Sequence, residues 1–126
     1  MLNKATVIRY ALNKYRSTLF VDSDLLFLSK IDFDFVHPIC LSEHLIYEKD
    51  IARTGRFNGG CIYVSDDRFP QWLVDTTKSR SKYYEQQTLD YVAEKFEHDV
   101  FPIQYNFGWW RPVSYTHLTL PTIYSV

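Results

Sequence analysis

The sequence predicts an α/β fold, because a helical pattern leads directly into a strand-forming run and further segments of both kinds follow. In residues 3–15 the apolar positions recur at intervals of three and four, which is typical of an amphipathic helix: Ile8, Ala11, Leu12 and Tyr15. Residues 18–21 are β-prone and apolar on both faces, which predicts a central strand of a covered sheet. A helix followed by such a strand indicates an α/β unit.

Two further strands are expected downstream. A weaker candidate runs from residue 39 to residue 47, and another strand covers residues 61–64. The segment Phe57-Asn58-Gly59-Gly60 leads into this last strand. Its glycines permit either a positive φ or the close approach of a ligand to the backbone.

Two helices are expected after these strands. Asp66 and Asp67 can cap a short helix with four residues on one face: Phe69, Trp72, Leu73 and Thr76. A second helix, from about residue 83 to residue 96, has a buried face made of Leu89, Val92, Ala93 and Phe96. Residues 100–110 then form an irregular aromatic segment.

The composition is that of a globular protein and argues against several classes. Hydrophobic residues make up 46% and charged residues 23%, and the formal net charge of −1 includes no basic block, so we expect no nucleic-acid partner. No apolar run reaches the roughly 18 residues of a membrane span, so we expect no transmembrane segment. Cys40 and Cys61 have no disulfide-framework or zinc-ligand spacing, which fits a reducing compartment. We expect a cytoplasmic location, or a membrane-peripheral one on the cytoplasmic side.

Residues 113–126 differ in kind from the rest of the chain. From Val113 the chain reads VSYTHLTLPT, which resembles the translation of a transposon adapter used in shotgun sequencing libraries. We therefore expect residues 113–126 to be a non-native tail and residues 1–112 to be the domain.

A pair of carboxylates stands at the end of the first predicted strand, in Asp22-Ser23-Asp24. Oxygen ligands suit a hard divalent cation, and ligands of open α/β sheets gather at the carboxyl ends of strands. Such a cation can bridge a diphosphate and neutralise the charge of a departing nucleoside diphosphate. The alternative for the same residues is a solvated turn or a helix cap.

The same spacing occurs a second time, in Asp32-Phe33-Asp34. This pair follows no buried strand, and its acids alternate with Phe33 and Phe35, which is typical of an exposed edge or turn. We therefore assign the candidate metal site to Asp22 and Asp24.

Several blocks together resemble glycosyltransferases of the GT-A fold, especially the family that includes glycogenin and bacterial lipopolysaccharide galactosyltransferases. The blocks are Lys4, Ala11-Leu12, residues 18–28, residues 57–64, residues 85–90 and Tyr105-Asn106. Their order and approximate separations agree with the family over residues 4–111. The resemblance implies a partial GT-A, Rossmann-like domain over residues 1–112, lacking its N-terminal strand or strands and its C-terminal part.

The resemblance also implies a set of site residues. Asp22 and Asp24 would hold Mn²⁺ or Mg²⁺ and the donor diphosphate. The other donor contacts would come from Ser23, Lys4, Asn58 and Gly59. The catalytic residues near the donor sugar would be Glu85 and Gln86, with Gln86 on the face where the acceptor approaches. Candidate acceptor contacts are Trp109, Trp110 and Asn106.

Most of these residues also have a structural interpretation. Asn58 and its glycines could be turn residues before a strand. Glu85 and Gln86 could be ordinary first-turn residues of a helix, and Lys4 could be a solvated lysine. His44 is a lone histidine after a strand, a position that is more often structural than catalytic.

Three features depart from the family pattern. Glu85 replaces an aspartate, which lengthens the side chain by one methylene. The family's opening strand, which cradles the nucleoside, is missing before the first helix. Its late histidine, a third metal ligand, would come after the point where the adapter-like tail begins. We therefore expect this chain to be inactive alone.

The leading hypothesis is a metal-dependent transferase that moves a sugar from a nucleotide-sugar donor to a hydroxyl group of a carbohydrate or glycolipid, in polysaccharide or glycolipid synthesis. The family resemblance implies retention at the anomeric carbon. One alternative is a non-catalytic carbohydrate-binding α/β module that stacks sugars on Trp72, Trp109 and Trp110. Another is a structural α/β domain in which the turn at Asp22-Ser23-Asp24 is merely solvated.

Overall fold

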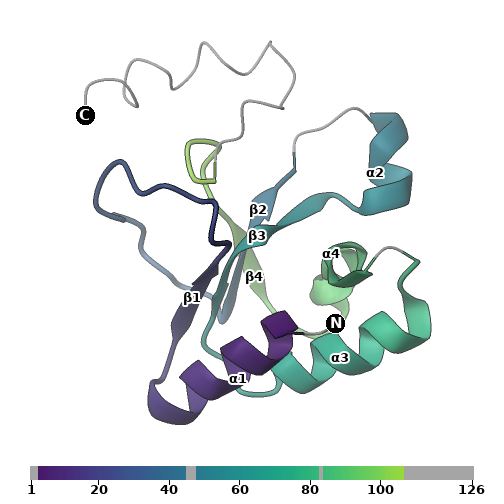
Figure 1. Ribbon diagram of the computed structural model, residues 1–126, viewed down its shortest axis with the longest axis horizontal. Helices are drawn as coiled ribbons and strands as arrows, with labels where there is room; N and C mark the ends of the chain where they lie inside the picture. Colours follow the sequence, from purple (N-terminus) through teal and green to yellow (C-terminus); the bar gives the residue numbers. More distant parts are fainter. Residues whose placement is uncertain (1–2, 45–47, 83, 107–126) are drawn as a thin grey trace.

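The computed structural model describes residues 3–44, 48–82 and 84–106 (Figure 1). Along the chain the elements are α1 Asn3–Lys14, β1 Thr18–Val21, β2 Ile39–Glu43, α2 Glu48–Thr54, β3 Phe57–Val64, α3 Phe69–Arg80, α4 Tyr84–Thr88, the 3-10 helix η1 Leu89–Glu94, and β4 His98–Val100. This arrangement confirms the predicted α/β class, and it confirms the leading helix and the strand that follows it.

The strands form one mixed sheet in the order β1-β3-β2-β4. Strand β3 is antiparallel to both β1 and β2, whereas β4 is parallel to β2. The prediction that β1 is a central strand is wrong for the described part of the chain, where β1 pairs with β3 along one side only. Its apolar residues are half-buried because α1 covers one face of the strand and the loop after β1 covers the other.

The face of the sheet that carries the helices holds the larger hydrophobic core. Figure 1 shows α1 and α3 side by side on one side of the sheet, and the two helices contact each other. Their inward residues pack against the inward residues of β2 and β3, and the fully buried members include Ile8, Ile39, Leu41, Ile62 and Phe69. Removing this apolar surface from water is the main stabilising contribution to the fold.

The opposite face is covered by loops rather than helices. The segment between β1 and β2 loops away from the helices in Figure 1 and contributes Phe33 and Phe35 to a second cluster. Phe35 stacks on Tyr63 with ring centroids 3.8 Å apart, and Phe101 stacks on Tyr105 at 5.4 Å. The rings of this cluster therefore pack against one another, with Phe101 buried and the others half-buried.

The helix expected from residue 83 to residue 96 is only partly correct. Helix α4 ends at Thr88 and continues as the 3-10 helix η1. Because a 3-10 helix has three residues per turn, Leu89 and Val92 share the buried face, while Ala93 is exposed instead of buried. The predicted face of α3 is confirmed for its buried residues, among them Phe69 and Leu73.

The cap expected at the start of α3 takes a different form. Asp66 accepts a hydrogen bond from the backbone N–H of Arg68 at 2.9 Å, and Arg68 itself occupies the N-cap position. Asp66 therefore closes the turn before the helix, and Asp67 is exposed.

We expect Leu41→Ala to lower the free energy of unfolding by about 2–5 kcal/mol, because Leu41 is fully buried and the truncation leaves a cavity. The matched control is Leu26→Ala, which makes the same change at a residue that is 77% exposed. That variant should stay within about 0.5 kcal/mol of the wild type in urea denaturation. Equal losses in the two variants would contradict the assigned core.

We also expect stability to fall as the pH rises above 9. Burial raises the pKa of the Cys40 thiol to about 12 and that of the Cys61 thiol to about 11, from the ordinary value of 9.0. Above pH 9 the unfolded chain therefore loses these protons while the folded chain keeps them. Each thiol then lowers the free energy of unfolding by up to about 1.4 kcal/mol per pH unit until its folded-state pKa is reached.

The measurement is denaturant unfolding at several pH values between 8 and 11. Replacing both cysteines by alanine should make this dependence on pH shallower, whatever it does to the absolute stability. A slope that is the same with and without the thiols would disprove the prediction.

Candidate functional site

An irregularity in β3 forms the centre of the candidate site. Leu41 of β2 pairs with Ile62, but the next residue, Ser42, pairs with Asn58. The part of β3 between these two partners therefore bulges away from β2, while it stays paired with β1 through Val21 and Cys61. Bulges of this kind re-aim side chains and often lie next to active sites. The polar residues predicted from the sequence meet at this bulge.

Asp22 lies at the bulge directly after β1. Its backbone N–H donates to the carbonyl of Gly60 at 2.9 Å, so the β1–β3 pairing continues into the motif. A Cβ placed on Gly60 would lie 2.9 Å from Oδ2 of Asp22 and 2.8 Å from Oδ1 of Asn58. Glycine is therefore needed at position 60 because two polar side chains lie close to its backbone. It is not needed for a positive φ, since Gly60 does not have one.

Asn58 is held in a fixed orientation by two donors. Its Oδ1 accepts the backbone N–H of Gly60 at 2.8 Å and the side-chain amide of Asn106 at 2.9 Å. Asn106 also donates to the hydroxyl of Ser42 at 3.4 Å and has a φ of 53°, a left-handed value that asparagine tolerates. Because β3 already begins at Phe57, the interpretation of Asn58 as a turn residue before the strand is wrong.

Lys4 reaches the same bulge from α1. Its Nζ donates to the carbonyl of Gly59 at 2.6 Å and lies 3.1 Å from Oε1 of Glu85. The two charged side chains are only 13% and 19% exposed, and Nζ lies 5.1 Å from the centre of the Phe20 ring. The interpretation of Lys4 as a solvated lysine is therefore wrong.

Gln86 lies on the other side of Gly59, next to His44. Its Oε1 accepts the backbone N–H of Gly59 at 3.4 Å, and its Nε2 donates to the carbonyl of Thr54 at 3.2 Å. The same Nε2 lies 3.4 Å from Nδ1 of His44. Sequence reasoning treated His44 as isolated, and no spacing in the sequence could show that it meets Gln86.

The rest of the motif at the end of β1 faces solvent. Ser23 and Asp24 are exposed, whereas Asp22 is half-buried, and the N–H of Leu25 closes the turn on the carbonyl of Asp22 at 3.2 Å. The motif thus places one carboxylate in the polar cluster and the other at the surface.

The second acidic pair behaves as predicted. Asp32 and Asp34 are exposed, while Phe33 and Phe35 between and after them belong to the aromatic cluster.

The described residues fit a divalent cation only in part. Asp22 and Asp24 offer the carboxylate oxygens that Mn²⁺ or Mg²⁺ prefers, and Glu85 adds a third carboxylate paired with Lys4. Within residues 3–44, 48–82 and 84–106, no three His, Cys, Asp or Glu side chains gather closely enough to hold a metal by themselves. A cation bound by the motif would therefore need further oxygen ligands from water or from a bound diphosphate.

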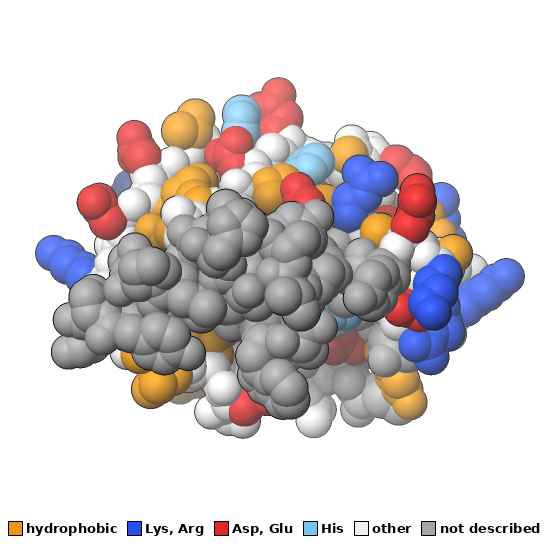
Figure 2. Space-filling view, turned by 90° about the horizontal axis from the view of Figure 1, so that it is seen from above, with side chains coloured by type: hydrophobic (Ala, Val, Ile, Leu, Met, Phe, Trp, Pro, Cys, Tyr) orange, Lys and Arg blue, Asp and Glu red, His pale blue; other side chains and the backbone are white. Residues whose placement is uncertain are grey.

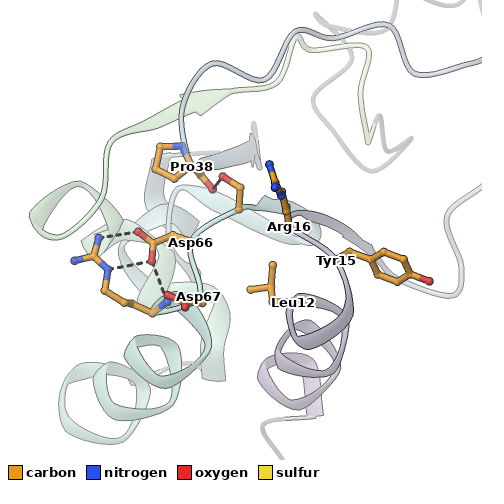
Figure 3. A pocket seen from close by; sticks show the side chains of 8 residues that line it. Leu12, Tyr15, Arg16, Pro38, Asp66 and Asp67 are labelled. Atoms are coloured by element: carbon orange, nitrogen blue, oxygen red, sulfur yellow. Dashed lines mark hydrogen bonds and ion pairs between the residues drawn. The ribbon is translucent and has the colours of Figure 1, made fainter.

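A separate hollow of about 590 Å³ lies away from this cluster (Figure 3). It is lined by Leu12, Tyr15, Arg16, Pro38 and residues 65–68. Arg16 and Pro38 precede β1 and β2, so the hollow is at the opposite end of the sheet from Asp22. Asp66 in its wall is paired with Arg68 at 2.7 Å, and this hydrogen-bonded partner lowers the pKa of Asp66.

Two of the predicted acceptor contacts, Trp109 and Trp110, lie outside the described residues, as does the tail from residue 113. The third, Asn106, is committed to Asn58 and Ser42. Trp72, one of the proposed stacking platforms, instead packs against the rings of Phe69 and Phe96.

On the face shown in Figure 2, the visible Lys and Arg side chains lie among Asp and Glu side chains along the edges. None of the helices in the described segments has the length and apolar character required to cross a bilayer.

The resemblance to GT-A glycosyltransferases is an expectation that comes from the sequence blocks alone. In the structure, several residues of these blocks gather at one bulge: Asp22, Asn58, Gly59, Lys4, Glu85 and Gln86. In comparisons with protein-family models, with curated proteins and with solved structures, this chain gives no match.

Proposed function

We propose that this chain is part of a metal-dependent glycosyltransferase, a partial GT-A domain that transfers a sugar from a nucleoside diphosphate to a hydroxyl acceptor. The observation that carries the proposal is the meeting of distant polar residues at the β3 bulge. Asp22 comes from the end of β1, Lys4 from α1, and Gln86 from α4. If Asp22-Ser23-Asp24 were only a solvated turn, nothing would require glycine at positions 59 and 60, where the side chains of Lys4 and Asp22 approach the backbone.

The charges at the bulge suit a diphosphate bound with a cation. Asp22 and Glu85 bring two carboxylates to the bulge, and Lys4 brings one ammonium group. Asp24 adds a third carboxylate at the adjacent surface, so the site is acidic without a bound cation. Mn²⁺ or Mg²⁺ held by Asp22 and Asp24 would supply Lewis-acid stabilisation of the leaving diphosphate. We place Ser23 at the same diphosphate.

The uncharged residues Asn58 and Gln86 and the ion-paired Glu85 offer hydrogen-bonding groups for a donor sugar. Because Oδ1 of Asn58 is occupied by two N–H groups, the orientation of its amide is fixed, and Nδ2 is the group that can donate to a sugar hydroxyl. Lys4 fixes the carboxylate of Glu85, which can accept a hydrogen bond from the sugar. Gln86 would act on the side where a carbohydrate or glycolipid acceptor approaches, and Asn106 would act through Asn58.

The test uses the second acidic pair of the chain as its control. We expect Asp22→Asn and Asp24→Asn to weaken binding of a nucleoside diphosphate in Mn²⁺ at least about tenfold, since each removes a charged oxygen ligand. Asp32→Asn and Asp34→Asn, which make the same change at the same spacing, should bind as the wild type does. The measurement is isothermal titration calorimetry with UDP, GDP, ADP and CDP, each in Mn²⁺ and in chelator.

Several outcomes would count against the proposal. Binding that is equal in Mn²⁺ and in chelator would remove the metal site. Loss of binding in all four variants alike would show that Asp22 and Asp24 have no special role. Binding of oligosaccharides without any nucleotide, unaffected by chelator, would favour the non-catalytic binding module.

Substitution of Gly60 should affect ligand binding without affecting the fold. Gly60→Ala should keep the fold, because the new Cβ meets only the ends of two side chains, Oδ2 of Asp22 and Oδ1 of Asn58. Those ends must move away, so we expect binding of the diphosphate in Mn²⁺ to fall at least about tenfold. Thermal unfolding and calorimetry on the same sample measure the two effects. Unchanged binding would show that the close approach at Gly60 does not matter for the ligand.

A further inference from the structure

We propose that Asp90 is a positioning residue that fixes Gln86 at the β3 bulge, acting through the turn of residues 54–56. Why the position of Gln86 matters rests on the proposed function. The positioning itself follows from the contacts on both sides of the turn.

The turn contacts Gln86 and its neighbour directly. The carbonyl of Thr54 accepts the side-chain Nε2 of Gln86 at 3.2 Å. The next residue, Gly55, has a φ of +92°, and a Cβ placed on it would lie 3.0 Å from Cα of Gln87 and 3.3 Å from the carbonyl oxygen of Gln86. The backbone of the turn is therefore pressed against the backbone of α4, a contact that only glycine allows.

Asp90 fastens the other end of the same turn. Its Oδ1 accepts the backbone N–H of Arg56 at 2.8 Å and lies 3.3 Å from the Cβ position of Gly55. The carbonyl of Arg56 in turn accepts the N–H of His44 at 2.8 Å, and Nδ1 of His44 lies 3.4 Å from Gln86. These contacts connect Asp90 to the side chain of Gln86 through the backbone of Arg56 and through His44.

Helix α4 needs such an anchor because it cannot define its own position. It has only 5 residues, begins at Tyr84 with a positive φ of 45°, and continues as a 3-10 helix. An isolated helix of this length is unstable, so its placement must come from tertiary contacts. The amide of Gln86 spans the gap from Thr54 to Gly59, so the place of the turn sets the place of this amide at the bulge.

Asp90 is suited to a mutational test because its side chain is exposed. Asp90→Ala removes the acceptor of the Arg56 N–H, whereas Asp90→Asn keeps an oxygen that can accept the same bond. The matched control is Glu94→Ala in the same 3-10 helix, where the carboxylate pairs with Arg80 at 2.8 Å and does not contact the turn. All three variants should fold.

The first measurement is NMR of the uniformly ¹⁵N-labelled chain, and it needs no activity. In Asp90→Ala we expect the amide proton of Arg56 to exchange at least about tenfold faster, the effect of one lost hydrogen bond. We also expect the side-chain amide signals of Gln86, identified by their loss in Gln86→Glu, to shift. Asp90→Asn should restore both signals, and Glu94→Ala should change neither. Unmoved Gln86 signals in Asp90→Ala, or equal shifts in Glu94→Ala, would overturn the proposal.

The second measurement is calorimetric binding of a nucleotide sugar in Mn²⁺, because we expect the chain alone to be inactive. Asp90→Ala should weaken binding several-fold, and Asp90→Asn should recover most of the loss. Unchanged binding in Asp90→Ala would overturn the inference that the position of Gln86 is set in this way. A wild-type chain that binds no nucleotide sugar would speak against the proposed function alone, and the NMR signals would still decide whether Asp90 positions Gln86.

Discussion

The candidate site depends on one steric constraint, the absence of side chains at Gly59 and Gly60 of β3. A Cβ on Gly59 would lie 2.8 Å from Nζ of Lys4, and a Cβ on Gly60 would lie 2.9 Å from Oδ2 of Asp22. Both distances are shorter than real Cβ contacts. The ammonium and the carboxylate therefore reach the backbone of β3 only because these two positions are empty, and the rest of the cluster is arranged around them.

The residues at the β3 bulge come from two kinds of element: well-packed ones and a short helix that depends on its contacts. Lys4 is carried by α1, whose Ala5 and Ile8 are buried in the larger core, and Asp22 follows a paired strand. Glu85 and Gln86 are carried by α4, which is short and is held by its contacts. This difference fits the roles that we propose, since Asp22 follows a paired strand and a metal and diphosphate site needs rigid ligands. Glu85 and Gln86, which we propose to lie near the donor sugar, depend instead on the ion pair with Lys4 and on the turn of residues 54–56.

Local patterns in the sequence were sufficient for most elements and for the exposure of the second acidic pair. The helical period of residues 3–15 and the run before Asp22 each specify an element, because burial of one face dictates the pattern. The same reasoning failed where tertiary contacts decide. Neither the edge position of β1 nor the change of α4 into a 3-10 helix has a local signal. Several of the predicted polar residues meet in the structure, but their geometry was not predictable, since the bulge at Asn58 and the meeting of His44 with Gln86 arise from contacts between distant segments.

The two acidic pairs show why a short motif has meaning only in its surroundings. Both have acids at the same spacing, and both leave an acid exposed to solvent. In Asp32-Phe33-Asp34 the central side chain is half-buried, because Phe33 packs against the aromatic cluster, and both acids are exposed. In Asp22-Ser23-Asp24 the central residue is polar, and the strand pairing carries on through the N–H of Asp22. Asp22 is thereby held over the backbone of Gly60 beside the side-chain amide of Asn58, and this environment is what can make a carboxylate pair into a binding site.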